Sequence, residues 1–165
     1  MRGLCVALVT VASASLADEA RGLEWQVPAS WAVERPRPVR AASYSVPRAD
    51  GDAEGPECAV FSFAPGLGGD VEQNVQLWTQ QFTDDVWQSA PTHVLTGQVA
   101  VTYVELDGTM RFGSSRGFVL RPAWKLLGAV VESPRGRLFF KLVGPKRSVE
   151  AAREAFRRMV DGSRG

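Results

Sequence analysis

Two short patterns in this 165-residue chain have the residue types of a hydrolase. The run Gly113-Ser-Ser-Arg-Gly117 matches the G-x-S-x-G elbow, in which a serine between a strand and a helix attacks a carbonyl with help from a histidine base. Cys58 and His93 could instead form a cysteine–histidine pair. However, the residues after Ser115 are strand-like, and Cys58 lies among apolar strand residues that would leave its thiol inactive. An enzyme that uses Cys58 or Ser115 therefore ranks third among the possible functions.

Two loops have weaker signatures of ion binding. The acidic residues of segment 50–55 alternate before a glycine, as at the start of a calcium loop. The twelfth position counted from Asp50 is Phe61, where such a loop needs a bidentate glutamate. The glycine run 65–70 precedes a helix as a phosphate-binding loop does, but it has no lysine and contains an aspartate that would repel an anion. We expect no cofactor and no metal site, and leave calcium binding by the acidic loop open.

Tryptophans and basic residues give the clearest indication of binding. The chain has five tryptophans, and two of them fall in segments that we interpret as loops. An aromatic side chain in a loop either covers the edge of a core or anchors a partner. A glycine- and arginine-rich segment, 113–124, lies next to the last of these tryptophans. We predict a contact surface made of Trp87, Arg116, Arg121, Trp124 and Lys125.

The amino-terminal residues have the layout of a secretory signal peptide. A basic start is followed by an uncharged stretch over 3–16, and small residues at Ser15 and Ala17 precede two acids. The stretch is too short for a stable membrane span. We predict a signal peptide over 1–17, a single domain over 18–165 and a periplasmic or extracellular location. Loss of Arg2 takes the 19 basic residues to 18, which equals the 18 acidic residues. A neutral protein has no overall field to hold phosphate backbones or anionic lipid, so a nucleic-acid partner is not expected.

The elements that must position these residues are mostly consecutive strands. Runs rich in β-branched and aromatic residues are separated by glycine and proline, which indicates strands joined by turns. Asp107-Gly108 has the composition of a hairpin turn, and Ser133 to Gly136 forms a second turn before the last strand. We expect two short strands within 23–33 and longer strands over 39–46, 57–63, 94–106, 110–112, 126–132 and 137–143.

Two helices interrupt these strands. Asp70 is a suitable N-cap for a helix that extends to Phe82, and Gln73 completes a capping box. A second apolar stripe at helical spacing runs from Val149 to Val160. Because the helices do not alternate with the strands, we predict an α+β fold, in which an antiparallel sheet of about six strands packs with two helices as an α/β sandwich.

This order of elements resembles the PsbP-like superfamily. The resemblance rests on the phrase Pro28-Ala-Ser-Trp31, on the glycine-led helix 66–82, and on the closing hairpin and helix over 126–160. The run from Phe139 to Pro145 is also similar to a phrase in uncharacterised secreted bacterial proteins. The resemblance implies docking onto a partner protein, so we expect a secreted or periplasmic non-enzymatic interaction module. The alternative is a small-ligand-binding protein with a pocket between sheet and helix, lined by aromatics and arginine.

Overall fold

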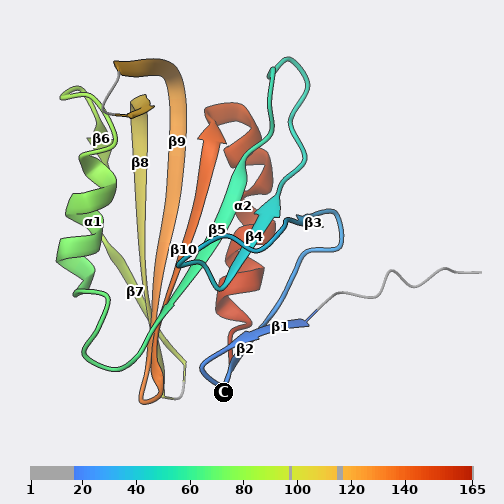
Figure 1. Ribbon diagram of the computed structural model, residues 1–165, viewed down its shortest axis with the longest axis vertical. Coiled ribbons are helices and arrows are strands. Elements are labelled where there is room, and N and C mark those ends of the chain that lie inside the picture. The colour runs from blue at the N-terminus through green and yellow to red at the C-terminus, as the bar shows by residue number, and fades with distance from the viewer. Residues whose placement is uncertain (1–16, 97, 115–116, 165) are drawn as a thin grey trace, which may run out of the picture.

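The computed structural model describes residues 17–96, 98–114 and 117–164. Strands occupy most of this part of the chain, and two helices interrupt them (Figure 1). In chain order the elements are β1 (Ala17–Ala20), β2 (Leu23–Gln26), β3 (Ala32–Val33), β4 (Ala42–Ser45), β5 (Glu57–Phe63), α1 (Val71–Thr79), β6 (Trp87–Gln88), β7 (Thr92–Thr96), β8 (Val99–Ser114), β9 (Gly117–Ser133), β10 (Gly136–Pro145) and α2 (Lys146–Asp161). The predicted signal peptide lies almost entirely outside the described residues.

One large antiparallel sheet dominates the molecule. Its strands follow the order β3-β4-β5-β10-β9-β8-β6, with β7 also paired to β8, and β1 and β2 form a separate two-stranded sheet. The α+β class predicted from the sequence is therefore confirmed. The large sheet has eight strands rather than about six. The segment expected as one strand over 94–106 is divided between β7 and β8, and the strand expected over 110–112 is part of β8. The two-residue β6 was not expected, because so short a strand shows no alternation in a sequence.

The two helices cover opposite faces of the large sheet. On β10, Leu138, Phe140 and Leu142 point into the core that holds the apolar side of α2. Phe139, between them, points into a second core that holds Val75 and other α1 residues. This alternation follows from the period of two along a strand. The two helices therefore pack on the two faces of one pleated sheet. In Figure 1, α1 is at the left and α2 lies behind β5, to the right of the middle.

The capping box predicted for α1 is present. The backbone N–H of Gln73 donates to the Asp70 carboxylate at 2.7 Å, and the Asp70 N–H donates to the Gln73 side chain at 3.0 Å. The closing hairpin and helix are also confirmed, with a turn between Ser133 and Gly136. These features are local, so the residues that form them lie close together in the sequence.

The hairpin turn predicted at Asp107-Gly108 is wrong. Both residues lie inside β8, where they pair with Lys125 and Trp124 of β9, and the register shifts between Gly108 and Met110. Pairing with β9 along the whole length of β8 outweighs the local turn preference of the dipeptide. The chain instead reverses between Ser114 and Gly117. Pro145, the last residue of β10, pairs with Trp124. The end of the β8–β9 hairpin therefore extends beyond β10.

Candidate functional site

The structure describes four of the five predicted contact residues, one on β6 and three on β9. Trp87 on β6 is 56% exposed, whereas Trp124 on β9 is only 9% exposed. Arg121 is exposed, with its guanidinium 5.9 Å from the centre of the Trp124 ring. Lys125 is buried, and Arg116 lies outside the described residues. The base of the hairpin brings together Arg121 and Trp124 on one face and Lys125 on the other. Trp87 lies across β8 from Lys125, because both residues pair with Asp107.

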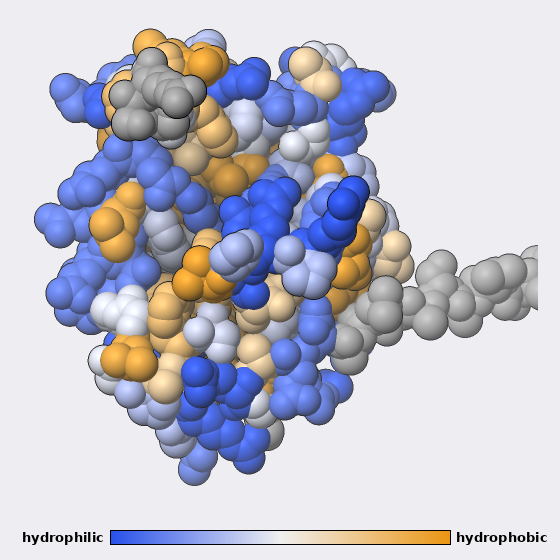
Figure 2. Space-filling view, in the orientation of Figure 1, coloured by the Kyte–Doolittle hydropathy of each residue, from blue (hydrophilic) through white to orange (hydrophobic). Residues whose placement is uncertain are grey.

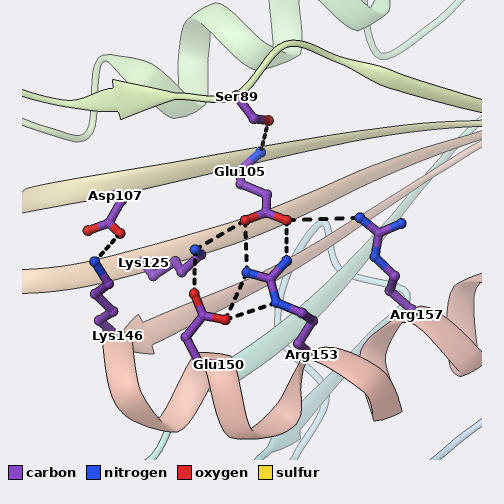
Figure 3. Close-up of polar contacts among 8 residues, drawn as sticks. All are labelled: Ser89, Glu105, Asp107, Lys125, Lys146, Glu150, Arg153 and Arg157. Atoms are coloured by element: carbon purple, nitrogen blue, oxygen red, sulfur yellow. Dashed lines mark hydrogen bonds and ion pairs between the residues drawn. The ribbon is translucent and has the colours of Figure 1, made fainter.

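Lys125 belongs to an ion-pair network between the sheet and α2 (Figure 3). Its ammonium lies 3.1 Å from the Glu105 carboxylate and 2.5 Å from the Glu150 carboxylate. Arg153 of α2 binds both carboxylates. It donates two hydrogen bonds to Glu105 and forms an ion pair with Glu150. These hydrogen bonds from Arg153, followed by those from Lys125, lower the pKa of Glu105 to about 2. Because its charges are mutually satisfied, we assign the network to holding α2 on the sheet.

The end of the β8–β9 hairpin carries large apolar side chains in the open. Phe118 is 71% exposed, Val119 58%, Leu120 56% and Phe112 40%. Figure 2 shows apolar residues, in orange, at the upper left of the molecule, where this end of the hairpin lies. Below them, Phe112 packs edge-on against Trp124 with ring centres 4.8 Å apart. We call residues 111–114 and 117–121 the hairpin end, and Trp124 lies at its base.

A groove follows α1 along the edge of the sheet. Three adjoining depressions of about 420, 440 and 470 Å³ lie between α1 and the segments 83–88 and 91–95. The first and second share Asp70, Glu72 and His93, and the second and third share Gln76 and Thr79. Because neighbouring depressions share lining residues, we treat them as one groove, the α1 groove. Its walls hold more acidic than basic side chains.

The cysteine–histidine pair is not formed. Cys58 is fully buried on β5, and His93 lies on β7, where its Nδ1 is 3.0 Å from the Thr102 hydroxyl. The strand order places four strand spacings between β5 and β7, roughly 19 Å. Burial raises the pKa of the Cys58 thiol well above its usual range. Cys58 is therefore a core residue without a base.

The described part of the serine pattern lies far from the histidine. Ser115 lies outside the described residues, but the neighbouring Ser114 ends β8, twelve residues beyond Thr102, which pairs with His93. Twelve strand residues span roughly 35–40 Å, so the hairpin end is out of reach of the imidazole. A strand, β9, follows the pattern where the hydrolase elbow needs a helix.

The acidic loop 50–55 has structural partners. The Asp52 carboxylate accepts hydrogen bonds from the backbone N–H of Ser148 at 3.0 Å and from its hydroxyl at 2.5 Å, so it caps the start of α2. Glu54 pairs with Arg121 at 3.0 Å. Within the described ranges, no group of three or more His, Cys, Asp or Glu side chains is placed to hold a metal ion.

Sequence reasoning missed two features. The exposure of Phe118, Val119 and Leu120 was hidden because three apolar residues in a row also fit a buried strand. The only indication in the sequence was that no polar side chain lies between Arg116 and Arg121. Lys141 was also missed: its half-buried ammonium donates to the Gln81 side chain, and burial, followed by the charge of Arg40, lowers its pKa to about 8. An isolated lysine in a strand gives no sequence pattern that would reveal this.

Comparison with known proteins identifies the fold. No family model matches the chain, and no curated protein matches it. The solution structure of cyanobacterial PsbP (CyanoP) from Synechocystis sp. PCC 6803 aligns with a TM-score of 0.55 at 12% identity, over 98% of this chain and 97% of that one. The crystal structure of PA94, a protein of unknown function from Pseudomonas aeruginosa, aligns with a TM-score of 0.50 at 9% identity, over 87% and 92%.

These alignments show that the chain has a PsbP-like fold, as its sequence suggested. At such low identity they show the fold alone. No helix in the described part of the chain is long and apolar enough to span a membrane.

Proposed function

We propose that this protein is a non-enzymatic interaction module that works in the periplasm or outside the cell and binds a partner protein. The predicted signal peptide over 1–17 supports the location. The α1 groove is the observation that carries the proposal of a protein partner. It extends along a whole helix at the edge of the sheet, as a surface for a chain segment would.

The charges of the α1 groove indicate the kind of partner segment. Asp70, Glu72 and Glu132 line one end, and Asp84 and Arg111 line the other. A segment with basic side chains complements this excess of carboxylates. Gln88 of β6 lines the groove, and the exposed Trp87 points to the other side of the same edge strand. A partner that covers β6 would bury this indole, which suits a contact anchor.

The alternative of an enclosed small-ligand pocket has less support. The two depressions between α1 and β7 are open, and their lining contains none of the expected arginine, tryptophan, tyrosine or phenylalanine side chains. The third depression has Phe82 and Arg111 in its lining, but it is open as well. A small ligand is bound mainly through enclosure by apolar and aromatic groups. The groove therefore fits a protein segment better.

Site-specific crosslinking tests the proposal. A photoreactive residue replaces Gln76, in the middle of the groove, and a matched one replaces Glu154, which is exposed on α2. We expect a discrete protein adduct from Gln76 in a native extracytoplasmic extract, and its loss when Trp87→Ala is added. Leu67→Ala, which truncates an exposed apolar residue in another loop, serves as the control and should keep the adduct. Equal adducts from positions 76 and 154 would refute a groove-specific partner.

A further inference from the structure

β7 forms an open edge of the large sheet. Within the described residues it pairs with β8 alone, with Thr92 opposite Tyr103 and Leu95 opposite Ala100. Alternate residues of such a strand direct their N–H and C=O groups away from the pairing partner. In Figure 1 β7 lies at the left edge of the sheet, below β6. The outer side of β7 can therefore accept one further strand.

β7 lacks the features that normally protect an edge strand. Folded proteins keep an edge strand short, or place a charged side chain or a proline in it. β3 at the opposite edge and the neighbouring β6 have only two residues each. β7 has five residues, and none of them is an acid, a lysine, an arginine or a proline. Two of its apolar side chains are in the open, since Leu95 is 75% exposed and Val94 38%.

The two faces of β7 have different surroundings. Val94 pairs with Val101 of β8, which points into the core beneath α2. Directly paired residues share a face, so Val94 lies on the α2 side of the sheet. His93 and Leu95 therefore lie on the α1 side, where His93 lines the α1 groove. A strand added to β7 continues this alternation, so every second side chain enters the groove and the others extend the row of Val94.

The carboxylates of the α1 groove select the charge of the side chains that enter it. Glu72 is exposed in the first turn of α1 and forms no ion pair with the described residues. Asp70 accepts the N–H of Gln73 and keeps its negative charge. Glu132 pairs with Arg137 at 2.8 Å and adds nothing to this excess. Basic side chains complement the two remaining carboxylates. A second copy of β7 has no lysine or arginine to supply that charge.

We propose that the partner protein adds an extended segment to β7 as a further strand, in which basic side chains alternate with apolar ones. The basic side chains enter the α1 groove beside Asp70 and Glu72, and the apolar ones continue the row of Val94 on the other face. This inference rests on the proposed function, because it specifies how the partner of the α1 groove is bound. Main-chain hydrogen bonds supply affinity in this mode of binding, and the alternating side chains supply the choice of partner.

Model peptides test the inference on the full chain. The probe is a fluorescein-labelled peptide of about seven residues in which lysine and valine alternate, and its binding is measured by fluorescence anisotropy. In a strand, the N–H groups of the lysines point to one edge and those of the valines to the other. Two further peptides are N-methylated, one at every lysine and the other at every valine. We expect one of these to lose affinity by about tenfold or more, because it cannot donate to β7, and the other to stay within about threefold of the parent.

Matched variants of the protein locate the strand that is bound. Leu95→Lys places a cation beside the lysines of the peptide, and Glu72→Gln removes a carboxylate from the groove. Each should weaken binding by about twofold to fivefold. The controls are Val33→Lys on β3, at the opposite edge, and Glu154→Gln on α2, both at exposed positions. The unfolding midpoints of all four variants are measured first and should match that of the wild type.

Three results would overturn the inference: no binding of the parent peptide, equal affinity of the two methylated peptides, or variants that bind as tightly as their controls. It is also overturned if the chain alone sediments as a dimer that Leu95→Lys dissociates, because a second copy would then occupy β7. A Gln76 adduct combined with failed peptide experiments would keep the partner and remove the added strand. Loss of the Gln76 adduct alone bears on the proposed protein partner, since the peptide experiments do not use the extract.

Discussion

The position of α1 depends on the absence of a side chain at Gly128. A Cβ added there would lie 2.2 Å from Cζ3 of Trp78, whereas ordinary contacts begin at 3.4 Å, so the indole would have to move by about 1.2 Å. Overpacking of this kind costs about 1–3 kcal/mol. Alanine is intrinsically better than glycine in a strand by roughly 0.5–1 kcal/mol, which offsets part of this cost. We expect Gly128→Ala to lower the free energy of unfolding by about 0.5–2 kcal/mol.

A double-mutant cycle identifies the cause. Trp78→Leu removes the large ring, so Gly128→Ala in that background should become neutral or stabilising by roughly 0.5–1 kcal/mol. The free energy of unfolding is measured by urea titration, with circular dichroism as the probe. The same displacement should weaken the Gln76 crosslink, since α1 forms one wall of the groove. An equal loss of stability in both backgrounds would refute the contact with Trp78 as the reason.

Three further predictions concern the other layers of the fold. Phe156→Ala empties a buried position beneath α2 and should destabilise the protein by about 3–5 kcal/mol in a urea titration; an unchanged midpoint would contradict the placement of α2. Glu105→Gln should cost about 1–3 kcal/mol at pH 7, because it leaves the buried Lys125 with one carboxylate fewer. The pKa of Glu105 is depressed on folding from 4.5 to about 2, so its contribution is complete above pH 4.5 and is lost as the pH falls towards 2. The stability difference between wild type and this variant should shrink over that interval, and a constant difference would count against the ion pairs. Cys58 should resist alkylation in the native protein and react after unfolding, as followed by peptide mass mapping, whereas rapid native labelling would show that its strand opens.

Several parts of the fold could be predicted because their causes are local. Asp70 and Gln73 lie within one helical turn, and the turn before Gly136 joins two strands that are adjacent in sequence. The apolar stripe from Val149 to Val160 has a helical period that needs no knowledge of its partner. In each case the residues that determine the structure are close neighbours along the chain.

The candidate site could be predicted only in part. The segment that ends in Trp124 was predicted to carry a contact surface, and its described residues include exposed apolar side chains. The roles within it were not predictable, because Trp124 and Lys125 look like surface residues of a loop until β8 is placed beside β9. Pairing across this hairpin buries the Trp124 ring under Phe112 and brings Lys125 to Glu105.

The sequence by itself determined the periodic elements, their caps and the α+β class, since hydrophobic periods and capping residues act within a few positions. Tertiary structure decided which apolar residues are core and which are surface. Phe139 and Phe118 look alike in the sequence, but β5 and α1 cover the first, whereas the second lies beyond the last residue of β10. Burial depends on the number of neighbouring elements that reach a position. That number is set by strand order and length across the whole sheet.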